Sequence, residues 1–233
     1  MQLYKIADAV VEMYPKYPET SYWYEPYRVD EKEYTKDFFI EATEKEILYL
    51  VENGENITAA VAENMILCDK FNKKLVRGFG SFIHSSALMY EDKVYLFSGD
   101  SGVGKSTHTK KWCRLFPDKA RVINDDKPSF RIIDDKCYIY GTPFAGGTDV
   151  QLNASGELGA LVFLERSEEN RLEKISSKQG LKLLMQQTPK LYSAEGVDRI
   201  LSIYSKILTD YPVYILHCAD NDNAVEVAFQ IIN

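Results

Sequence analysis

The stretch Val94–His108, VYLFSGDSGVGKSTH, contains the most specific pattern in this sequence. Its residues Gly99, Gly104, Lys105 and Ser106 fill the template G-x-x-x-x-G-K-[ST] of a phosphate-binding loop. An apolar run precedes the loop, and residues 107–116 form a predicted helix that ends at a proline. The order strand, loop, helix predicts a layered α/β domain with a nucleotide phosphate site at the end of one strand.

The loop residues explain why phosphate would bind there. Glycines adopt backbone conformations that are closed to other residues, so that successive N–H groups can turn inward around phosphates, and the following helix adds its positive end. We expect Lys105 to bridge the β and γ phosphates and the Ser106 hydroxyl to bind Mg²⁺. The predicted nucleotide-binding residues are Gly99, Ser101, Gly102, Val103, Gly104, Lys105, Ser106 and Thr107.

A second polar group follows about 20 residues later, at Asn124, Asp125 and Asp126. The preceding Val122 and Ile123 indicate a short buried strand, and ligands of open α/β sheets bind at the carboxyl ends of strands. We expect one carboxylate to serve Mg²⁺ and the other to accept a proton from an attacking hydroxyl, without deciding which does which. The alternative is an ordinary solvated turn.

The chain around these two groups alternates strands and helices. Residues 82–90 and 94–97 predict one hairpin, residues 130–133 and 137–140 a second, and residues 158–164 a strand covered on both faces. Further predicted elements are helices over 177–187 and 197–208, a strand over 213–216 and a helix over 223–232. Residues 79–233 therefore form the predicted mixed-sheet α/β domain.

Residues 1–78 predict a separate, small α+β lobe. Tyrosines and prolines crowd residues 14–35, which favours extended or irregular chain; the aromatic rings are either a packed core or a ligand platform. Thr43 and Glu46 form a capping-box pattern for a short helix, and apolar spacings of three and four over 57–75 predict a longer helix with a buried stripe.

Composition narrows the class of protein. The 233 residues carry 28 Lys and Arg against 35 Asp and Glu, a net charge of −7, which argues against nucleic acid or anionic membranes as partners. The four cysteines show no disulfide or zinc spacing, and no apolar run resembles a signal peptide or a membrane span. We expect a cytoplasmic protein, and the sequence leaves open whether it forms a homo-oligomer.

The quoted motifs resemble a known family. The run Ile83-His84-Ser-Ser-Ala, the loop Ser98-Gly-Asp-Ser-Gly-Val-Gly-Lys-Ser and Asn124-Asp-Asp look like the kinase domain of HPr kinase/phosphorylase, which shares its fold with phosphoenolpyruvate carboxykinases. The similarity covers roughly residues 80–165. It implies ATP- and Mg²⁺-dependent phosphorylation of a hydroxyl, with Asp125 or Asp126 as general base and His84 at the place of a family histidine.

The departures from that family indicate a different acceptor. Thr107 stands where HPr kinases have Glu, the N-terminal lobe differs, and the family's later signature is not found in the run that begins at Gly141. Ser106-Thr-His-Thr, Trp112 and Gly141-Thr-Pro-Phe look more like smaller HPr-kinase-like proteins, some of which phosphorylate serine in peptide precursors or as a free amino acid. The resemblance thus implies a serine of a peptide, protein or small molecule rather than HPr.

Other residues have roles that the sequence leaves open. His84 could orient an Asp, shuttle a proton or be a core residue, and His108 is expected at the surface. Transition-state charge could be balanced by Lys127, Arg131 or Arg166. Residues 141–153 are either a mobile substrate loop or an ordinary connection.

Two functions other than a kinase are consistent with the same residues. One is a nucleotide sensor without catalysis, in which binding rearranges the two lobes. The other is a phosphorylase that removes phosphate from phosphoserine.

Overall fold

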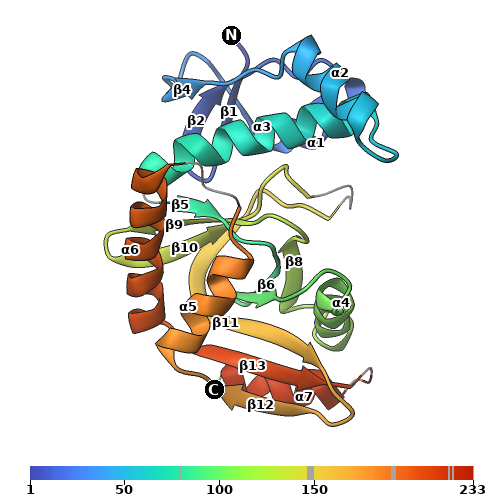
Figure 1. Cartoon of the computed structure of the whole chain (residues 1–233), viewed down its shortest axis with the longest axis vertical. Helices are drawn as coiled ribbons and strands as arrows, with labels where there is room; N and C mark the ends of the chain where they lie inside the picture. The colour runs from blue at the N-terminus through green and yellow to red at the C-terminus, as the bar shows by residue number, and fades with distance from the viewer. Residues whose placement is uncertain (79, 146–149, 190–192, 220, 222, 233) are drawn as a thin grey trace.

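A mixed β-sheet with helices on both faces forms the larger part of the molecule, and a small lobe with its own sheet covers one end of it (Figure 1). The computed structural model describes residues 1–78, 80–145, 150–189, 193–219, 221 and 223–232. The predicted boundary at residue 79 and part of the predicted loop 141–153, residues 146–149, lie outside the described residues. Among the described residues, none of the helices combines the length and the apolar character that a bilayer crossing requires.

The N-terminal lobe combines four short strands with three helices. Its sheet has the order β3-β1-β2-β4. Its elements are β1 (Leu3–Ile6), β2 (Ala9–Glu12), α1 (Pro18–Tyr24), β3 (Arg28–Val29), β4 (Phe38–Phe39), α2 (Glu44–Asn53) and α3 (Ala59–Leu75). Short 3₁₀ turns follow α1, at Glu25–Tyr27, and α3, at Val76–Gly78.

Local sequence signals account for the helices of the lobe, with one correction. The capping box of Thr43 and Glu46 is present at the start of α2, and Thr58 caps α3. The expectation of extended or irregular chain over residues 14–35 is wrong in part, because α1 forms there. Pro18 occupies the first turn of α1, where a missing N–H costs nothing and the fixed φ favours a helix.

The larger sheet is mixed and curled. Its main order is β5-β9-β10-β11-β7-β6-β8, and β13 pairs with both β11 and β12. Its strands are β5 (Gly80–Phe82), β6 (Ser85–Tyr90), β7 (Lys93–Ser98), β8 (Ala120–Asn124), β9 (Ser129–Ile133), β10 (Lys136–Tyr140), β11 (Ser155–Arg166), β12 (Arg171–Lys174) and β13 (Val213–Cys218). The first half of the long strand β11 pairs with β10 and its second half with β13, so the sheet branches along one strand.

Two layers of helices cover this sheet. The helices are α4 (Lys105–Leu115), α5 (Ser177–Gln186), α6 (Ala194–Asp210) and α7 (Asn223–Ala228), the last followed by a 3₁₀ turn at Phe229–Ile231. α5 and α6 lie on one face of the sheet, and α4 and α7 lie on the other (Figure 1). Their apolar side chains belong to the two clusters that cover these faces. β12 has no counterpart among the elements predicted from the sequence.

The predicted strand over 82–90 is two strands, which is a second correction. β5 pairs with β9, whereas β6 pairs with β7 and β8. Ile83 and His84 form the break between them, and there the His84 N–H donates to the carbonyl of Gln187 and the Ser85 N–H to that of Asp126. The break therefore places His84 beside the chain segment that follows β8.

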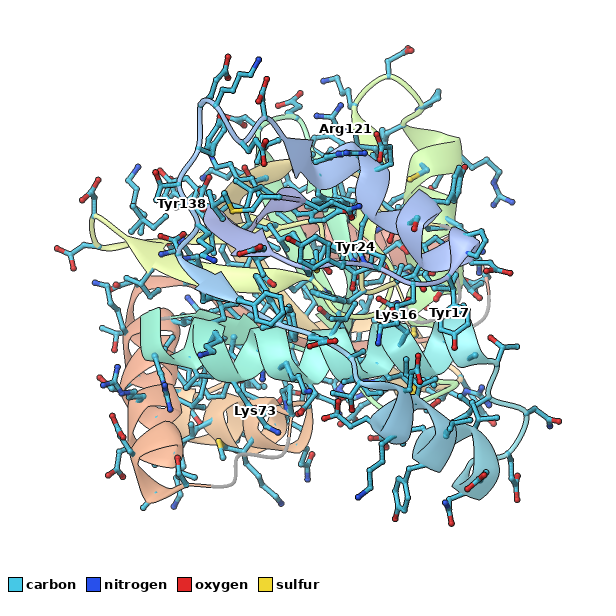
Figure 2. The ribbon with its side chains drawn as sticks, turned by 90° about the horizontal axis from the view of Figure 1, so that it is seen from above. Lys16, Tyr17, Tyr24, Lys73, Arg121 and Tyr138 are labelled. Carbon is cyan, nitrogen blue, oxygen red and sulfur yellow. The ribbon has the colours of Figure 1, made fainter. Side chains whose placement is uncertain are left out.

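The two lobes share one hydrophobic core. In the view from above, α3 crosses most of the width of the molecule, with Tyr24 near the centre (Figure 2). Phe82 and Phe144 of the larger domain pack with Phe71 and Tyr24 of the lobe, and all four rings are buried. Burial of rings this large fixes the lobe against the sheet.

The tip of the β1–β2 hairpin adds polar contacts between the lobes. The Arg131 guanidinium donates to the Ala7 carbonyl at 2.9 Å, and the Tyr140 hydroxyl donates to the Asp8 carboxylate at 2.7 Å. Burial and the hydrogen bond to Asp8 raise the pKa of Tyr140. Arg131, one of the three predicted cations, therefore serves the contact between the lobes.

Candidate functional site

The loop between β7 and α4 has the backbone shape that its glycines allow. Gly99, Gly102 and Gly104 have φ values of 136°, 76° and 114°, in the left-handed region that favours glycine. The Val103 N–H donates to the Asp100 carbonyl at 3.2 Å and closes a turn inside the loop. The chain thus passes from a buried strand into a helix through a curved backbone segment.

Lys105 points back into this loop. Its side chain is buried, and its ammonium donates to the carbonyls of Gly99 at 2.9 Å and Asp100 at 3.0 Å. Burial lowers the pKa of Lys105, while the negative charges of Asp126, Asp100 and Asp125 oppose that shift. A phosphate at the loop would supply the negative charge that this desolvated ammonium lacks.

The first turn of α4 has amides available for an anion. Gly104 is the N-cap in a left-handed conformation, and none of the described side chains caps this helix end. Its first turn contains no acidic residue. Helix N-termini attract anions through unpaired N–H groups and the helix dipole.

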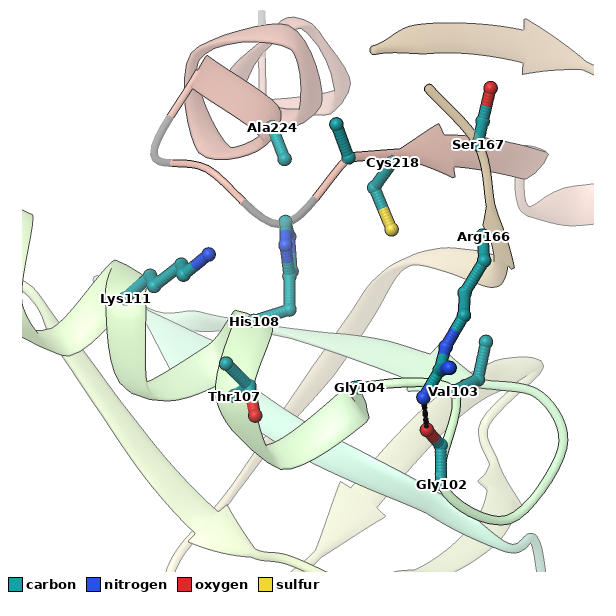
Figure 3. A pocket seen from close by; sticks show the side chains of 11 residues that line it. Gly102, Val103, Gly104, Thr107, His108, Lys111, Arg166, Ser167, Cys218 and Ala224 are labelled. Atoms are coloured by element: carbon teal, nitrogen blue, oxygen red, sulfur yellow. Dashed lines mark hydrogen bonds between the residues drawn. The ribbon is translucent and has the colours of Figure 1, made fainter. Parts of the chain in front are cut away.

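A cavity of about 380 Å³ lies beside the loop and the N-terminal half of α4 (Figure 3). Arg166 reaches across it from the end of β11 and donates to the Gly102 carbonyl. Its wall consists of Gly102, Val103, Gly104, Thr107, His108, Lys111, Arg166, Ser167, Cys218, Ala219 and Ala224. Four predicted nucleotide residues line the cavity, whereas Gly99, Ser101, Lys105 and Ser106 belong to the loop outside this wall.

His108 differs from the expectation of a surface residue. Its ring is 4% exposed, packs against Phe97, and its Nε2 accepts a hydrogen bond from the Trp112 indole at 3.0 Å. Burial, with a smaller contribution from the charge of Lys111, lowers the pKa of His108 to about 4. A neutral imidazole thus lines the loop cavity at neutral pH. His108 lies on the face of α4 that packs against the core. Its position four residues before Trp112, on the same helix face, could have indicated this burial from the sequence.

Asn124 ends β8 and organises the acidic segment. Its Nδ2 donates to the carbonyl and hydroxyl oxygens of Thr142, at 2.9 and 3.1 Å. Its Oδ1 accepts the N–H groups of Asp126 at 3.0 Å and Lys127 at 2.8 Å. The strand has ended before the two aspartates, so strand alternation does not separate them. Sequence reasoning missed this role, although Asn before a turn is a known signal for such bonds.

The two aspartates have different surroundings. Asp125 is 7% exposed, and its Oδ1 has no hydrogen-bond partner among the described residues. Asp126 is more exposed and forms an ion pair with the Lys127 ammonium. Burial acts to lower the pKa of Lys127, but the charge of Asp126 and weaker contributions outweigh it, and the pKa is raised. Lys127 therefore stays charged beside Asp126.

His84 is in contact with the same carboxylate. Its Nε2 lies 3.5 Å from Asp126 Oδ1, and its Nδ1 lies 3.1 Å from Gln187 Oε1. Burial lowers the pKa of His84, the charge of Lys105 acts in the same direction, and the charge of Asp126 opposes both. His84 is therefore neutral near pH 7, and a donor Nδ1–H toward Gln187 leaves the Nε2 lone pair facing Asp126.

Oxygen ligands for Mg²⁺ are present in this part of the molecule. Asp125 Oδ1 is a buried carboxylate oxygen without a hydrogen-bond partner among the described residues. Burial of such an oxygen costs free energy unless a cation or a hydrogen-bond donor contacts it. Among the described residues no three His, Cys, Asp or Glu side chains form a cluster that could hold a metal by itself. Mg²⁺ in nucleotide sites needs only one or two carboxylates together with phosphates and water. The residues fit an ion that arrives with a nucleotide.

Asp126 and Lys127 face a second cavity, of about 350 Å³, between the lobes. The loop cavity does not contain them in its wall. The predicted residues thus border two cavities, one at the loop and one at the acidic segment. Lys105 is within electrostatic range of both aspartates, so the two groups belong to one charged region.

Comparisons with known proteins found similarity to solved structures but not to families or curated proteins. No protein-family model matches this sequence, and no curated protein matches it. One similar solved structure is the Hpr(Ser) kinase/phosphatase from Coxiella burnetii, with a TM-score of 0.41 and 10% sequence identity over 65% of this chain and 88% of that chain. A similarity of this size does not establish a family, so the functional argument depends on the geometry of the site.

Proposed function

We propose that this protein is an ATP- and Mg²⁺-dependent kinase that transfers the γ-phosphoryl group to a hydroxyl. The observation that carries the proposal is the buried ammonium of Lys105, held by carbonyls of the loop that precedes an uncapped helix. The hydrogen-bond partners of this buried cation are neutral carbonyls, so it lacks a direct contact with a negative charge. A triphosphate beside it gives it one.

The two aspartates are assigned different roles in this proposal. Asp125 supplies the metal ligand, because its free Oδ1 is buried, and the Ser106 hydroxyl is the further oxygen ligand that the sequence offers. The metal, when bound, would neutralise charge on the phosphates. Asp126 acts as the general base, because it is accessible from the second cavity.

His84 completes the proton path in this proposal. Asp126 takes the proton of the acceptor hydroxyl as its oxygen attacks the γ-phosphorus, and the neutral Nε2 of His84 stands next to that carboxylate to share the proton. Lys105 and the loop amides hold the phosphates. Arg166 is the further cation at the loop, whereas Arg131 is committed to the contact between the lobes.

The first experiment measures nucleotide binding by calorimetry for the wild type and for Lys105→Ala. We expect a loss of ATP affinity of about tenfold to a hundredfold, because the variant loses a charge-assisted contact. Lys110→Ala is the matched control, since Lys110 is exposed one turn further along α4. Equal ATP affinity of Lys105→Ala and wild type, with both folded by circular dichroism, would contradict the proposal.

A nucleotide sensor is the rival function, and single-turnover transfer separates the two. A sensor that rearranges its lobes must separate Phe82 and Phe144 from the core of the N-terminal lobe, where both are buried. We therefore expect phosphoryl transfer rather than a large change in shape. Binding of ATP with a change in scattering radius and no transfer would favour the sensor. Formation of pyrophosphate and serine from phosphoserine and added inorganic phosphate would favour the phosphorylase.

A further inference from the structure

The second cavity lies where the N-terminal lobe meets the acidic segment. Its volume is about 350 Å³, at the lower end of the roughly 300–1,000 Å³ that is common for small-molecule pockets. Its wall consists of Trp23, Val61, Asn64, Met65, Cys68, Asp69, Asn72, Phe82, Asp126, Lys127, Phe144 and Pro189. Most of these residues come from α1 and α3, so the lobe builds the greater part of the cavity around the carboxylate of Asp126.

The wall is largely apolar, with a few oriented polar groups. The rings of Trp23, Phe82 and Phe144 and the side chain of Met65 form its apolar part. Asn72 Oδ1 accepts the Phe82 N–H at 3.1 Å and the Ser81 hydroxyl at 3.0 Å, which fixes the orientation of its amide. An apolar wall with a small number of fixed polar groups is typical of a small-molecule site.

The charges of the wall disfavour an anionic ligand. Asp69 forms an ion pair with Lys73, which lies outside the wall, and Asp126 forms one with Lys127, the only cation among the described residues of the wall. The charge of the Lys127 ammonium is already balanced by Asp126, so the wall offers no excess positive charge to a carboxylate or phosphate on a ligand. A ligand that enters this cavity without a negative charge avoids the repulsion from both carboxylates.

We propose that this cavity binds the phosphoryl acceptor, and that the acceptor is an uncharged small-molecule alcohol with an apolar or aromatic body. This inference rests on the proposed kinase function and names the substrate class for it. The apolar body lies against Trp23 and Phe144, and the hydroxyl points to Asp126. The acceptor oxygen forms a bond to the γ-phosphorus of ATP, the bond from that phosphorus to the β–γ bridging oxygen breaks, ADP leaves, and the hydroxyl proton passes to Asp126.

Transfer from ATP to three chosen acceptors tests the substrate class. They are 2-phenylethanol, tropate, which has the same skeleton with an added carboxylate, and glycerol, which is uncharged and lacks an apolar body. We expect kcat/KM for 2-phenylethanol to exceed that for each of the others by at least about tenfold, from burial of the ring. Tropate or glycerol performing equally well overturns the proposal.

A cavity-filling variant tests the location. Val61→Phe enlarges a partly exposed side chain of the wall, and we expect it to raise KM for 2-phenylethanol without changing KM for ATP. Leu48→Phe is the matched control, because Leu48 is 57% exposed on α2 and lies outside the wall. An unchanged KM in Val61→Phe places the acceptor elsewhere and overturns the location.

A fluorescence titration tests binding of the alcohol to the second cavity independently of nucleotide binding. The sequence has two tryptophans, Trp23 in the wall of this cavity and Trp112, which is fully buried. A saturable change in tryptophan emission on addition of 2-phenylethanol therefore reports binding in this cavity if Trp23→Phe abolishes the change. Absence of that change overturns the inference. Wild-type protein that binds ATP but transfers nothing to 2-phenylethanol overturns the acceptor assignment alone. Failure to bind ATP overturns the proposed function, and the titration still decides whether the cavity takes the alcohol.

Discussion

Replacement of His108 by Gln should change how the stability of the protein depends on pH. The ring is buried against Phe97, and its pKa falls from 6.5 to about 4 in the folded state. The unfolded chain therefore binds this proton at a higher pH than the folded chain does. The free energy of unfolding therefore decreases as the pH falls from about 6.5 to about 4. A variant without the imidazole lacks this decrease.

The size of the effect follows from the two pKa values. At pH 5 the unfolded imidazole is almost fully protonated, whereas the folded one is protonated in only about a tenth of molecules. The free energy of unfolding should therefore fall by about 2 kcal/mol between pH 7 and pH 5 because of this single group. The substitution also changes the absolute free energy of unfolding, so the quantity to compare is its change with pH and not its value at one pH.

Urea denaturation of wild type and His108→Gln at pH 7, 6 and 5 measures the difference. We expect the wild type to lose about 2 kcal/mol more than the variant over this range. Lys111→Gln is the matched control: it removes the smaller contribution to the shifted pKa and keeps the ring of His108 buried, so it should retain most of the pH dependence of the wild type. Parallel curves for wild type and His108→Gln would refute burial as the cause of the shifted pKa.

Three further predictions concern the acidic segment and the contact between the lobes. Asp126→Asn should slow phosphoryl transfer by about 10²–10⁴-fold without a matching loss of ATP affinity in calorimetry, as expected for a general base; a pure loss of affinity would make it a metal ligand. Asp125→Asn should raise the Mg²⁺ concentration for half-maximal transfer, and an unchanged Mg²⁺ titration would remove it from the metal site. Phe144→Ala should lower the free energy of unfolding by about 3–5 kcal/mol in urea titrations, because the ring lies at the centre of the shared core. A loss below about 1 kcal/mol would mean that the core closes around the vacancy or that the two lobes hold together without it.

The strand and helix pattern of the larger domain was largely predictable because it depends on local signals. Apolar periodicity, capping residues and turn residues gave the two hairpins, the long strand β11 and the helices α3 to α6 close to their observed bounds. The missed elements lack such signals. β12 has few apolar residues, and the strands of the N-terminal lobe are two to four residues long, too short for a period to emerge.

The candidate site was predictable only in its parts. The loop that ends in Lys105 and the pair Asp125 and Asp126 stand out because each is a contiguous motif. Asn124 with Thr142, His84 with Gln187, and the wall that α3 gives to the second cavity depend on residues that are far apart in the chain. A single amino-acid sequence contains no signal that identifies such pairs of distant residues.

The amino-acid sequence by itself determined the glycine loop and the places of the longer helices and strands, because hydrogen bonds, caps and glycine conformations act over a few residues. The tertiary structure alone decided that Asp126 meets His84 and Lys127 beside a cavity between the lobes and that Phe144 joins the two lobes. Burial and electrostatic interactions act through space and not along the chain, so these properties exist only once distant segments are packed together.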